Sequence, residues 1–368
     1  SDLFQTYSAG VKTNRDAWCC NFSVTDLTLS MSACIDFYNH QVLQHSENND
    51  ADIFLNMDET KIKWTQDVIS DVKKGRFYQF EKKDLYPSLY RPYTPQWLYF
   101  NKKWNWSRYL MPSFFPSGEQ KNLTINLSGI GFANGFSVIM SNLIPSHDLI
   151  SKGQCFPLYL YEPTEQATPA DDLFSRSDDG LDSPQQPQYT RRDAITDDGL
   201  AHFADYYAAQ TNGETISKED LFYYIYGLLH SEDYRSRYAD NLSKELPRIP
   251  RVKTYAHFKH FSDAGRQLAH YHLNYESVEP YPVQFNCNLD SLTAEDFYVT
   301  KMKFGAGKDK STVIYNPKIT MSGIPLAAYD YVVNGKPALE WVIERQCVKT
   351  DKDSGIVNDA NDWAIETM

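Results

Sequence analysis

The sequence contains no run of 18 or more apolar residues, and its first ten residues, SDLFQTYSAG, combine neither a basic region nor an apolar stretch. A membrane span needs about 20 mostly apolar residues, and a secretory signal needs a basic region followed by an apolar one. We therefore expect a cytoplasmic protein that has no membrane partner and folds around an ordinary core, since 42% of its residues are hydrophobic.

Cysteine is scarce and is not spaced for metal binding or for a disulfide framework. The six cysteines contain no CxxC pair, and only Cys19 and Cys20 are neighbours. His257 and His260 are three residues apart, but His270 and His272 would point to different sides of a helix. We expect buried thiols, ordinary histidines and no metal site.

Catalytic and cofactor motifs are also missing. The sequence has neither GxSxG nor HExxH, and in GIGFANG, residues 129–135, the third glycine comes one place late and strand-like FSVIM follows. In AGKDKS, residues 306–311, Asp309 occupies the position where a phosphate-binding loop has a magnesium-binding hydroxyl. We expect no catalytic residue and no cofactor in this chain.

Charge is distributed unevenly along the chain. The formal charge of −12 argues against a polyanionic partner, because affinity for DNA comes from lysines and arginines that neutralise phosphates. However, residues 45–59 and 162–198 carry all of that excess, whereas 60–110 hold eleven bases and four acids, and 244–261 hold five bases and one acid. These two basic stretches indicate either a nucleic-acid surface or merely a solvated one, and the former requires the basic side chains to gather in space.

Hydrophobic patterning favours an α+β fold in which a β-rich core is accompanied by a helical subdomain. Apolar residues repeat at helical spacing in 30–44, and Ser217 to Asp220 resemble a capping box. Short aromatic and β-branched runs between 85 and 161 predict strands. The expected segments are 1–78, helical and mixed; 79–161, β-rich; 162–190, an acidic, proline-rich linker; 191–276, helical; and 277–368, a β-hairpin with C-terminal helices.

Three local predictions concern the second half of the chain. Residues 262–274 predict a helix, and strand-like 298–304 and 311–323 flank a basic turn at 305–310. The apolar stretches 324–333 and 336–346 predict two further helices.

Six stretches of the sequence, in order, resemble the C-terminal specificity region of type ISP restriction-modification enzymes. They are YSAGVKTNRDAW, RPYTPQWLYF, GQCFPLYLYE, TRRDAIT, YYIYGLLHSEDYRSRYADNLSKELPRIP and YNPKITMSGIPLAAYDYVVNGKPALEWVIERQCVKTDKDSGIVNDANDWA. The resemblance covers nearly the whole chain, from Tyr7 to Ala364.

The resemblance implies a target-recognition domain that follows a nuclease, a helicase-like ATPase and an adenine N6-methyltransferase in one polypeptide. Its partners would be double-stranded DNA and that methyltransferase. S-adenosylmethionine, ATP and magnesium would serve the other modules and none of them this chain. A methyltransferase must extract its adenine from the duplex, so a second surface has to read the neighbouring base edges.

Ten residues are candidates for DNA contact. Asn14 and Arg15 lie in TNRDAW, which is more typical of a turn stabilised by its own polar side chains and anchored by Trp18. Lys102, Lys103 and Arg108 alternate with Trp104 and Trp106, a pattern that also fits a β-hairpin with core tryptophans. The remaining candidates are Arg248, Arg251 and Lys253, where two prolines hold the chain extended in a pattern that also fits a helix exit, and Lys308 and Lys310 at the basic turn.

Two alternative functions stay open at this point, one of them a free-standing nuclease or glycan-active enzyme that uses the acids and aromatics. Net acidity and 26 tyrosines also suit a protein-interaction or scaffold module that does not bind DNA.

Overall fold

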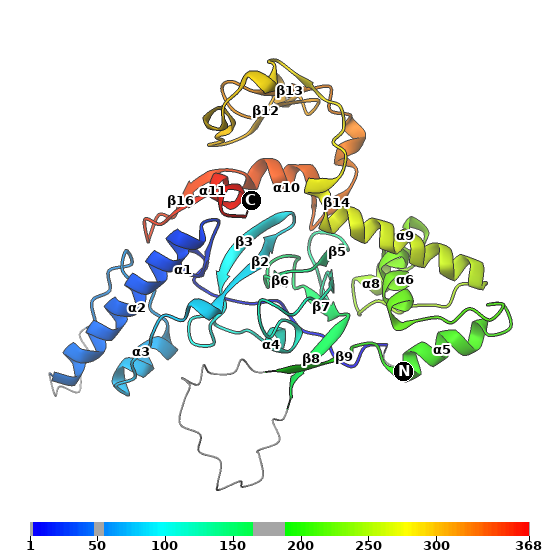
Figure 1. The fold of residues 1–368 in the computed structure, drawn as a ribbon, viewed down its shortest axis with the longest axis horizontal. Helices are drawn as coiled ribbons and strands as arrows, with labels where there is room; N and C mark the ends of the chain where they lie inside the picture. Colours follow the sequence, from blue (N-terminus) through cyan, green and yellow to red (C-terminus); the bar gives the residue numbers. More distant parts are fainter. Residues whose placement is uncertain (1–2, 48–54, 165–187, 368) are drawn as a thin grey trace, which may run out of the picture.

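A central β-rich region separates two groups of helices in the computed structural model, and a small lobe stands above them (Figure 1). The structure describes residues 3–47, 55–164 and 188–367. Most of the predicted acidic linker, and part of the acidic stretch 45–59, therefore lie outside the described residues. The five-segment division stays a prediction.

The N-terminal helices cover one side of the β-rich region. The helix predicted at 30–44 is confirmed and is longer, because Ser23 caps its first turn by accepting a hydrogen bond from the Asp26 amide at 3.0 Å. Its predicted apolar face, which includes Met31, Tyr38 and Val42, is fully buried. The elements are α1 (Asp16–Cys19), β1 (Cys20–Asn21), α2 (Val24–Glu47) and α3 (Gln66–Lys73).

The prediction of strands between 85 and 161 is confirmed. Two of the sheets have strand orders β1-β3-β2-β6 and β5-β4-β7, β8 belongs to a third sheet, and the pairing of β2 with β6 is parallel. FSVIM indeed enters a strand, β5, rather than a helix. The elements are η1 (Lys82–Asp84), β2 (Leu85–Arg91), β3 (Thr94–Tyr99), α4 (Met111–Phe114), β4 (Thr124–Leu127), β5 (Val138–Ser141), β6 (Ile144–Pro145), β7 (Gln154–Pro157) and β8 (Tyr159–Pro163).

The second group of helices packs on the other side of the β-rich region. The predicted capping box is confirmed, with Ser217 and Asp220 each accepting a hydrogen bond from the other's backbone amide. The helix predicted at 262–274 begins earlier, at Tyr255, because Thr254 caps it. The elements are β9 (Tyr189–Asp193), which pairs with β8, α5 (Asp197–Tyr207), α6 (Lys218–His230), α7 (Glu232–Arg237), α8 (Ala239–Leu242) and α9 (Tyr255–Leu273).

Helices α6 and α9 approach each other through glycine. A Cβ on Gly265 would lie 1.9 Å from the Tyr223 carbonyl oxygen, and one on Gly227 would lie 2.2 Å from that of Phe261. Only glycine allows this separation, which places the side chains of both helices in one buried cluster with β4 and β5.

The C-terminal third forms a small lobe and then returns to the N-terminal region. The lobe contains the four-stranded sheet β10-β13-β12-β11, and the C-terminal end lies near α1 and α2 (Figure 1). The elements are η2 (Tyr275–Ser277), β10 (Gln284–Phe285), η3 (Leu289–Ser291), η4 (Ala294–Phe297), β11 (Lys303–Phe304), η5 (Ala306–Lys308), β12 (Thr312–Ile314), β13 (Thr320–Ser322), η6 (Leu326–Tyr329), β14 (Val332–Val333), β15 (Lys336–Pro337), α10 (Ala338–Arg345), β16 (Val348–Thr350), β17 (Val357–Asp359) and α11 (Ala360–Thr367).

The predicted helix at 324–333 is wrong. A single 3-10 turn, η6, is followed by β14, which pairs with β15 across Asn334 and Gly335. Both turn residues have positive φ, 50° and 76°, as a two-residue hairpin requires. Asn-Gly is a strong hairpin signal, so local turn chemistry prevailed over the apolar run. The helix predicted at 336–346 is confirmed as α10, and the hairpin around 305–310 is confirmed as β11 and β12.

Candidate nucleic-acid interface

Two groups of the candidate residues lie side by side because the backbones of Lys12 and Ser107 pair. The Lys12 amide donates to the Ser107 carbonyl at 2.9 Å, and the Ser107 amide donates to the Lys12 carbonyl at 3.0 Å. Segment 12–15 is thereby fixed against the turn that holds residues 102–108. We call Lys12, Asn14, Lys102, Trp106 and Tyr109 the turn surface; Asn14, Lys102, Trp106 and Tyr109 are exposed, and Lys12 is partly buried.

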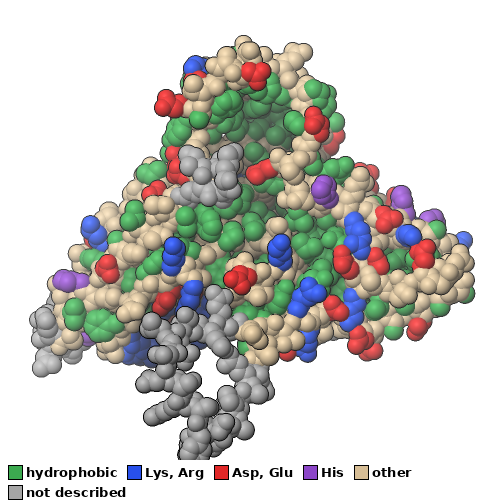
Figure 2. All heavy atoms as spheres, viewed as in Figure 1, with side chains coloured by type: hydrophobic (Ala, Val, Ile, Leu, Met, Phe, Trp, Pro, Cys, Tyr) green, Lys and Arg blue, Asp and Glu red, His purple; other side chains and the backbone are tan. Residues whose placement is uncertain are grey.

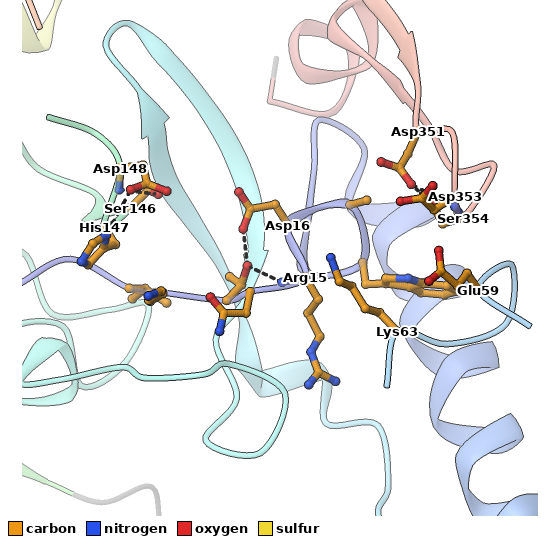
Figure 3. A pocket seen from close by; sticks show the side chains of 16 residues that line it. Arg15, Asp16, Glu59, Lys63, Ser146, His147, Asp148, Asp351, Asp353 and Ser354 are labelled. Carbon is orange, nitrogen blue, oxygen red and sulfur yellow. Dashed lines mark hydrogen bonds and ion pairs between the residues drawn. The ribbon is translucent and has the colours of Figure 1, made fainter. Parts of the chain in front are cut away.

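Asn14 is one of the residues that line a cavity of about 390 Å³. Figure 3 shows Arg15 and Asp16 in the middle of the lining, with His147 and Asp148 on one side and Glu59, Lys63, Asp351 and Asp353 on the other. Asn14 has a φ of 56°, a conformation that asparagine tolerates better than most residues, and its side chain is exposed.

Arg15, in contrast, is a core residue in this structure. Its side chain is 4% exposed, donates to the Thr65 hydroxyl at 2.7 Å, and lies over the ring of Trp104 at 5.4 Å. Asp16, which accepts a hydrogen bond from Thr13 and one from the Tyr90 hydroxyl at 3.0 Å, fixes the turn. A guanidinium enclosed in this way cannot reach a duplex, so the structural interpretation of TNRDAW is favoured for Arg15 but not for Asn14.

Lys102 and Lys103 are neighbours with different surroundings. The Lys103 ammonium lies 3.2 Å from an Asp67 carboxylate oxygen and also contacts Asp71, and its side chain is only 17% exposed. Burial raises the pKa of Asp71, but the hydrogen bonds from Lys103 and Tyr78 outweigh that effect and leave the pKa below its usual value. Lys103 is therefore neutralised within the fold, whereas Lys102 is exposed.

The tryptophans of this turn also differ. Trp104 is 1% exposed and belongs to the N-terminal core cluster, as the structural interpretation predicted, although the turn is not a hairpin. Trp106 is 57% exposed. Arg108 is partly buried and lies 5.0 Å from the centre of the Phe100 ring, with Nη1 donating to the Phe100 carbonyl at 3.4 Å. Tyr109 stacks on His147 at 6.3 Å, a contact that the sequence did not indicate.

Arg248, Arg251 and Lys253 lie in the extended segment between α8 and α9. The Arg248 side chain is 85% exposed and pairs with Glu245 at 2.9 Å. Arg251 lies over the ring of Tyr206 at 4.4 Å, and Lys253 is exposed. All three side chains can reach a ligand outside the fold.

Lys308 and Lys310 lie at the turn of the C-terminal lobe. Lys308 has a φ of 64° and is exposed. Lys310 pairs with Glu340 at 2.5 Å and lies 5.3 Å from the centre of the Tyr329 ring. Lys308 is therefore the more available of the two.

The ten candidates do not form a single basic patch. They occupy the turn surface and its surroundings, the segment before α9, and the tip of the C-terminal lobe, which adjoin three different hydrophobic clusters. On the face shown in Figure 2, lysines and arginines are likewise spread among acidic side chains. The expectation that the basic residues gather in space is wrong for this set as a whole, so any contact with a duplex has to come from several separate points.

The described residues contain no group of three or more histidine, cysteine or acidic side chains arranged to hold a metal ion. His272 contacts the Tyr226 hydroxyl and is largely buried, while His257, His260 and His270 lie elsewhere along the same helix. Within the described ranges no helix combines the length and the apolar character that crossing a bilayer requires.

Comparisons with known proteins agree over nearly the whole chain. The model of a family described as the Type ISP C-terminal specificity domain matches residues 2–368. No curated protein matches. Among solved structures, the chain is similar to the ATP-dependent Type ISP restriction-modification enzyme LlaBIII bound to DNA, with 32% identity over 99% of this chain and 22% of that one, and a TM-score of 0.82.

Two further structures are similar. A nuclease-deletion mutant of the Type ISP restriction-modification enzyme LlaGI in complex with a DNA substrate mimic is 32% identical, over 99% of this chain and 30% of that one, with a TM-score of 0.81. The DrdV–DNA complex is 33% identical, over 96% of this chain and 32% of that one, with a TM-score of 0.75. The chain thus spans between 22% and 32% of the length of these three proteins.

Proposed function

The chain belongs to the family of Type ISP C-terminal specificity domains, and we propose that it recognises the target sequence on double-stranded DNA for a restriction-modification enzyme. The observation that carries this proposal is the match along the whole chain, together with 32% identity to an enzyme of this type that is bound to DNA. A specificity domain needs a surface that positions the duplex and side chains that discriminate bases.

The exposed candidates provide the positioning contacts. Lys102, Arg251, Lys253 and Lys308 are exposed, and each would neutralise a phosphate. Asn14 offers a donor and an acceptor that can pair with a base edge or with a phosphate and sugar. Lys103, Lys310 and Arg15 contribute mainly to the fold, because their charges already have partners or lie buried.

The catalytic steps belong to other parts of the same polypeptide in this proposal. An adenine N6-methyltransferase that uses S-adenosylmethionine would pack against this domain, and an ATP- and magnesium-dependent nuclease module would complete the enzyme. The cavity around residues 13–16 presents both acids and bases, which suits contact with a charged protein surface. This chain then acts without a cofactor of its own.

Salt-dependent binding tests the proposal. Fluorescence anisotropy should be measured on the polypeptide that contains this chain and the methyltransferase, with labelled random and genomic duplexes over a salt series. Because each neutralised phosphate contributes a slope of about −0.9 in log K against log salt concentration, we expect a slope of roughly −3 or steeper and tighter binding of a subset of genomic duplexes. Absence of binding at low ionic strength would instead favour a protein-interaction module.

A further inference from the structure

The sheet of the C-terminal lobe has one face packed and one face open. Its strands lie in the order β10-β13-β12-β11, all antiparallel. Phe304, Val313, Met321 and Phe285 are cross-strand neighbours, and the first three belong to the small core of the lobe. Because successive side chains of a strand point to opposite faces, the residues beside them lie on the outer face.

That outer face carries side chains suited to reading bases. Lys303, Ile314 and Thr320 form one row across β11, β12 and β13, and Gln284 on β10 begins the next row. Lys303 and Gln284 are exposed, Ile314 is 36% exposed, and Thr320 is partly buried. The Lys303 ammonium can donate to guanine, and the Ile314 side chain can contact the thymine methyl group. The Gln284 amide can pair with adenine, and the Thr320 hydroxyl can donate to a base or accept from one.

The dimensions of this face match the major groove. Neighbouring strands lie about 4.8 Å apart, so the row from Lys303 to Thr320 spans roughly 10 Å, and a B-DNA major groove is about 12 Å wide. Two side chains on one face of a strand lie roughly 7 Å apart, which equals about two base-pair steps of 3.4 Å. The two rows can therefore face different base pairs of one site.

The charge around the sheet favours DNA as the occupant of this face. Between residues 298 and 320 the sequence contains five lysines and one acid, Asp309. Lys310 and Lys318 pair with Glu340 and Asp296, whereas Lys301, Lys303 and Lys308 form no ion pair with a described residue. The Asp309 carboxylate already accepts hydrogen bonds from the Ser311 and Thr312 hydroxyls.

We infer that the outer face of this sheet enters the major groove of the target and determines part of the recognised sequence, with Lys303 and Ile314 as specificity-determining residues. The inference rests on the proposed function and deepens it, because it assigns base reading to one face of the lobe. Ile314 contacts a thymine methyl group, and Lys303 donates to the N7 and O6 atoms of a guanine.

Base analogues test this assignment directly. The target is first selected from a randomised duplex library with the polypeptide that contains this chain and the methyltransferase. Uracil then replaces each thymine of the target in turn, which removes only the methyl group, and 7-deazaguanine replaces each guanine, which removes N7. Affinities are measured for the wild type and for the variants Ile314→Ala and Lys303→Ala, together with their thermal unfolding.

We expect one uracil position and one 7-deazaguanine position to weaken wild-type binding by roughly 5- to 100-fold, the size of one base contact. Ile314→Ala should be insensitive to that uracil, and Lys303→Ala to that 7-deazaguanine, since the partner of the altered atom is gone. Lys303→Arg should remain sensitive. Leu29→Ala, which removes an aliphatic side chain that is 64% exposed on α2, is the matched control for Ile314 and should behave as the wild type.

Two results would overturn the inference. If the wild type selects a target but both variants keep its full sensitivity to the analogues, the sheet does not read bases and the proposed function stands. If the wild type selects no sequence from the library, the proposed function fails and the inference fails with it.

Discussion

Lys12 and Ser107 hold each other by two backbone hydrogen bonds, 2.9 and 3.0 Å long, although they come from segments far apart in the chain. This pairing places Asn14 beside the turn that carries Lys102 and Trp106. The turn surface therefore depends on a contact between main chains, which is less sensitive to side-chain substitution than an ion pair would be.

Substitutions of the neighbouring residues Lys102 and Lys103 should have different effects, the first on DNA binding and the second on stability. Lys102→Ala removes an exposed charge, so we expect the magnitude of the salt slope of DNA binding to fall by about 1, with unchanged stability. Lys103→Ala removes the ammonium partner of the buried Asp71 carboxylate, which keeps its ion pair with Arg76 at 3.1 Å, and should cost about 2 kcal/mol of unfolding free energy. Anisotropy and urea unfolding of both variants provide the measurements. Equal effects of the two substitutions on stability would contradict the assignment.

Asn14 allows its side chain to be tested without disturbing its backbone. Because its φ is 56°, Asn14→Gly should keep the turn intact, whereas Asn14→Ala should destabilise the protein by about 1 kcal/mol. If the amide contacts DNA or the methyltransferase, both variants lose affinity or activity by a similar factor. A loss confined to Asn14→Ala would show that the residue serves only the turn.

Two largely buried histidines predict a loss of stability in mild acid. Burial lowers the pKa of His230 to about 3 and the pKa of His272 to about 4, so both are neutral in the folded protein. The unfolded chain binds protons near the ordinary pKa of 6.5, and stability should therefore be complete above that pH and decline as pH falls toward about 4. Each histidine should contribute a slope of about 1.4 kcal/mol per pH unit.

Urea unfolding at several pH values between about 7 and 5 measures that slope. His272→Gln and His230→Gln should each make the dependence shallower than in the wild type, because glutamine does not titrate. His257→Gln, on an exposed site of α9, is the control and should retain the wild-type slope. Parallel curves for all four proteins would rule out the two buried histidines as the cause.

Gly265 should not tolerate alanine, although alanine favours helices by about 1 kcal/mol over glycine. A Cβ at this position would lie 1.9 Å from the Tyr223 carbonyl, so α6 and α9 would have to separate. We expect Gly265→Ala to lower the unfolding free energy by about 3 kcal/mol. A Cβ added at Gly118 would have no other heavy atom within 4 Å, so Gly118→Ala serves as the control. Thermal or urea unfolding of the two variants decides the matter, and a stabilised Gly265→Ala would refute the close contact.

Patterns of neighbouring residues were enough to predict several elements. The buried face of α2, the capping box of α6 and the hairpin of β11 and β12 each depend on residues within a few positions of one another. The error at 324–333 arose where two local signals competed, and the Asn334-Gly335 turn prevailed over an apolar run. The close approach of α6 and α9 could not be predicted from the sequence, because an isolated glycine in a helix does not indicate which segment packs against it.

The order of motifs along the chain determined the family, since such motifs are read from the sequence itself. Which basic residues are free to meet DNA was decided only by the tertiary structure. Lys102 and Lys103 look equivalent in the sequence, but Asp67 and Asp71 come from α3 to neutralise only one of them. The charge that a lysine presents to a ligand depends on its nearest counterion, and folding brings that counterion from a distant segment.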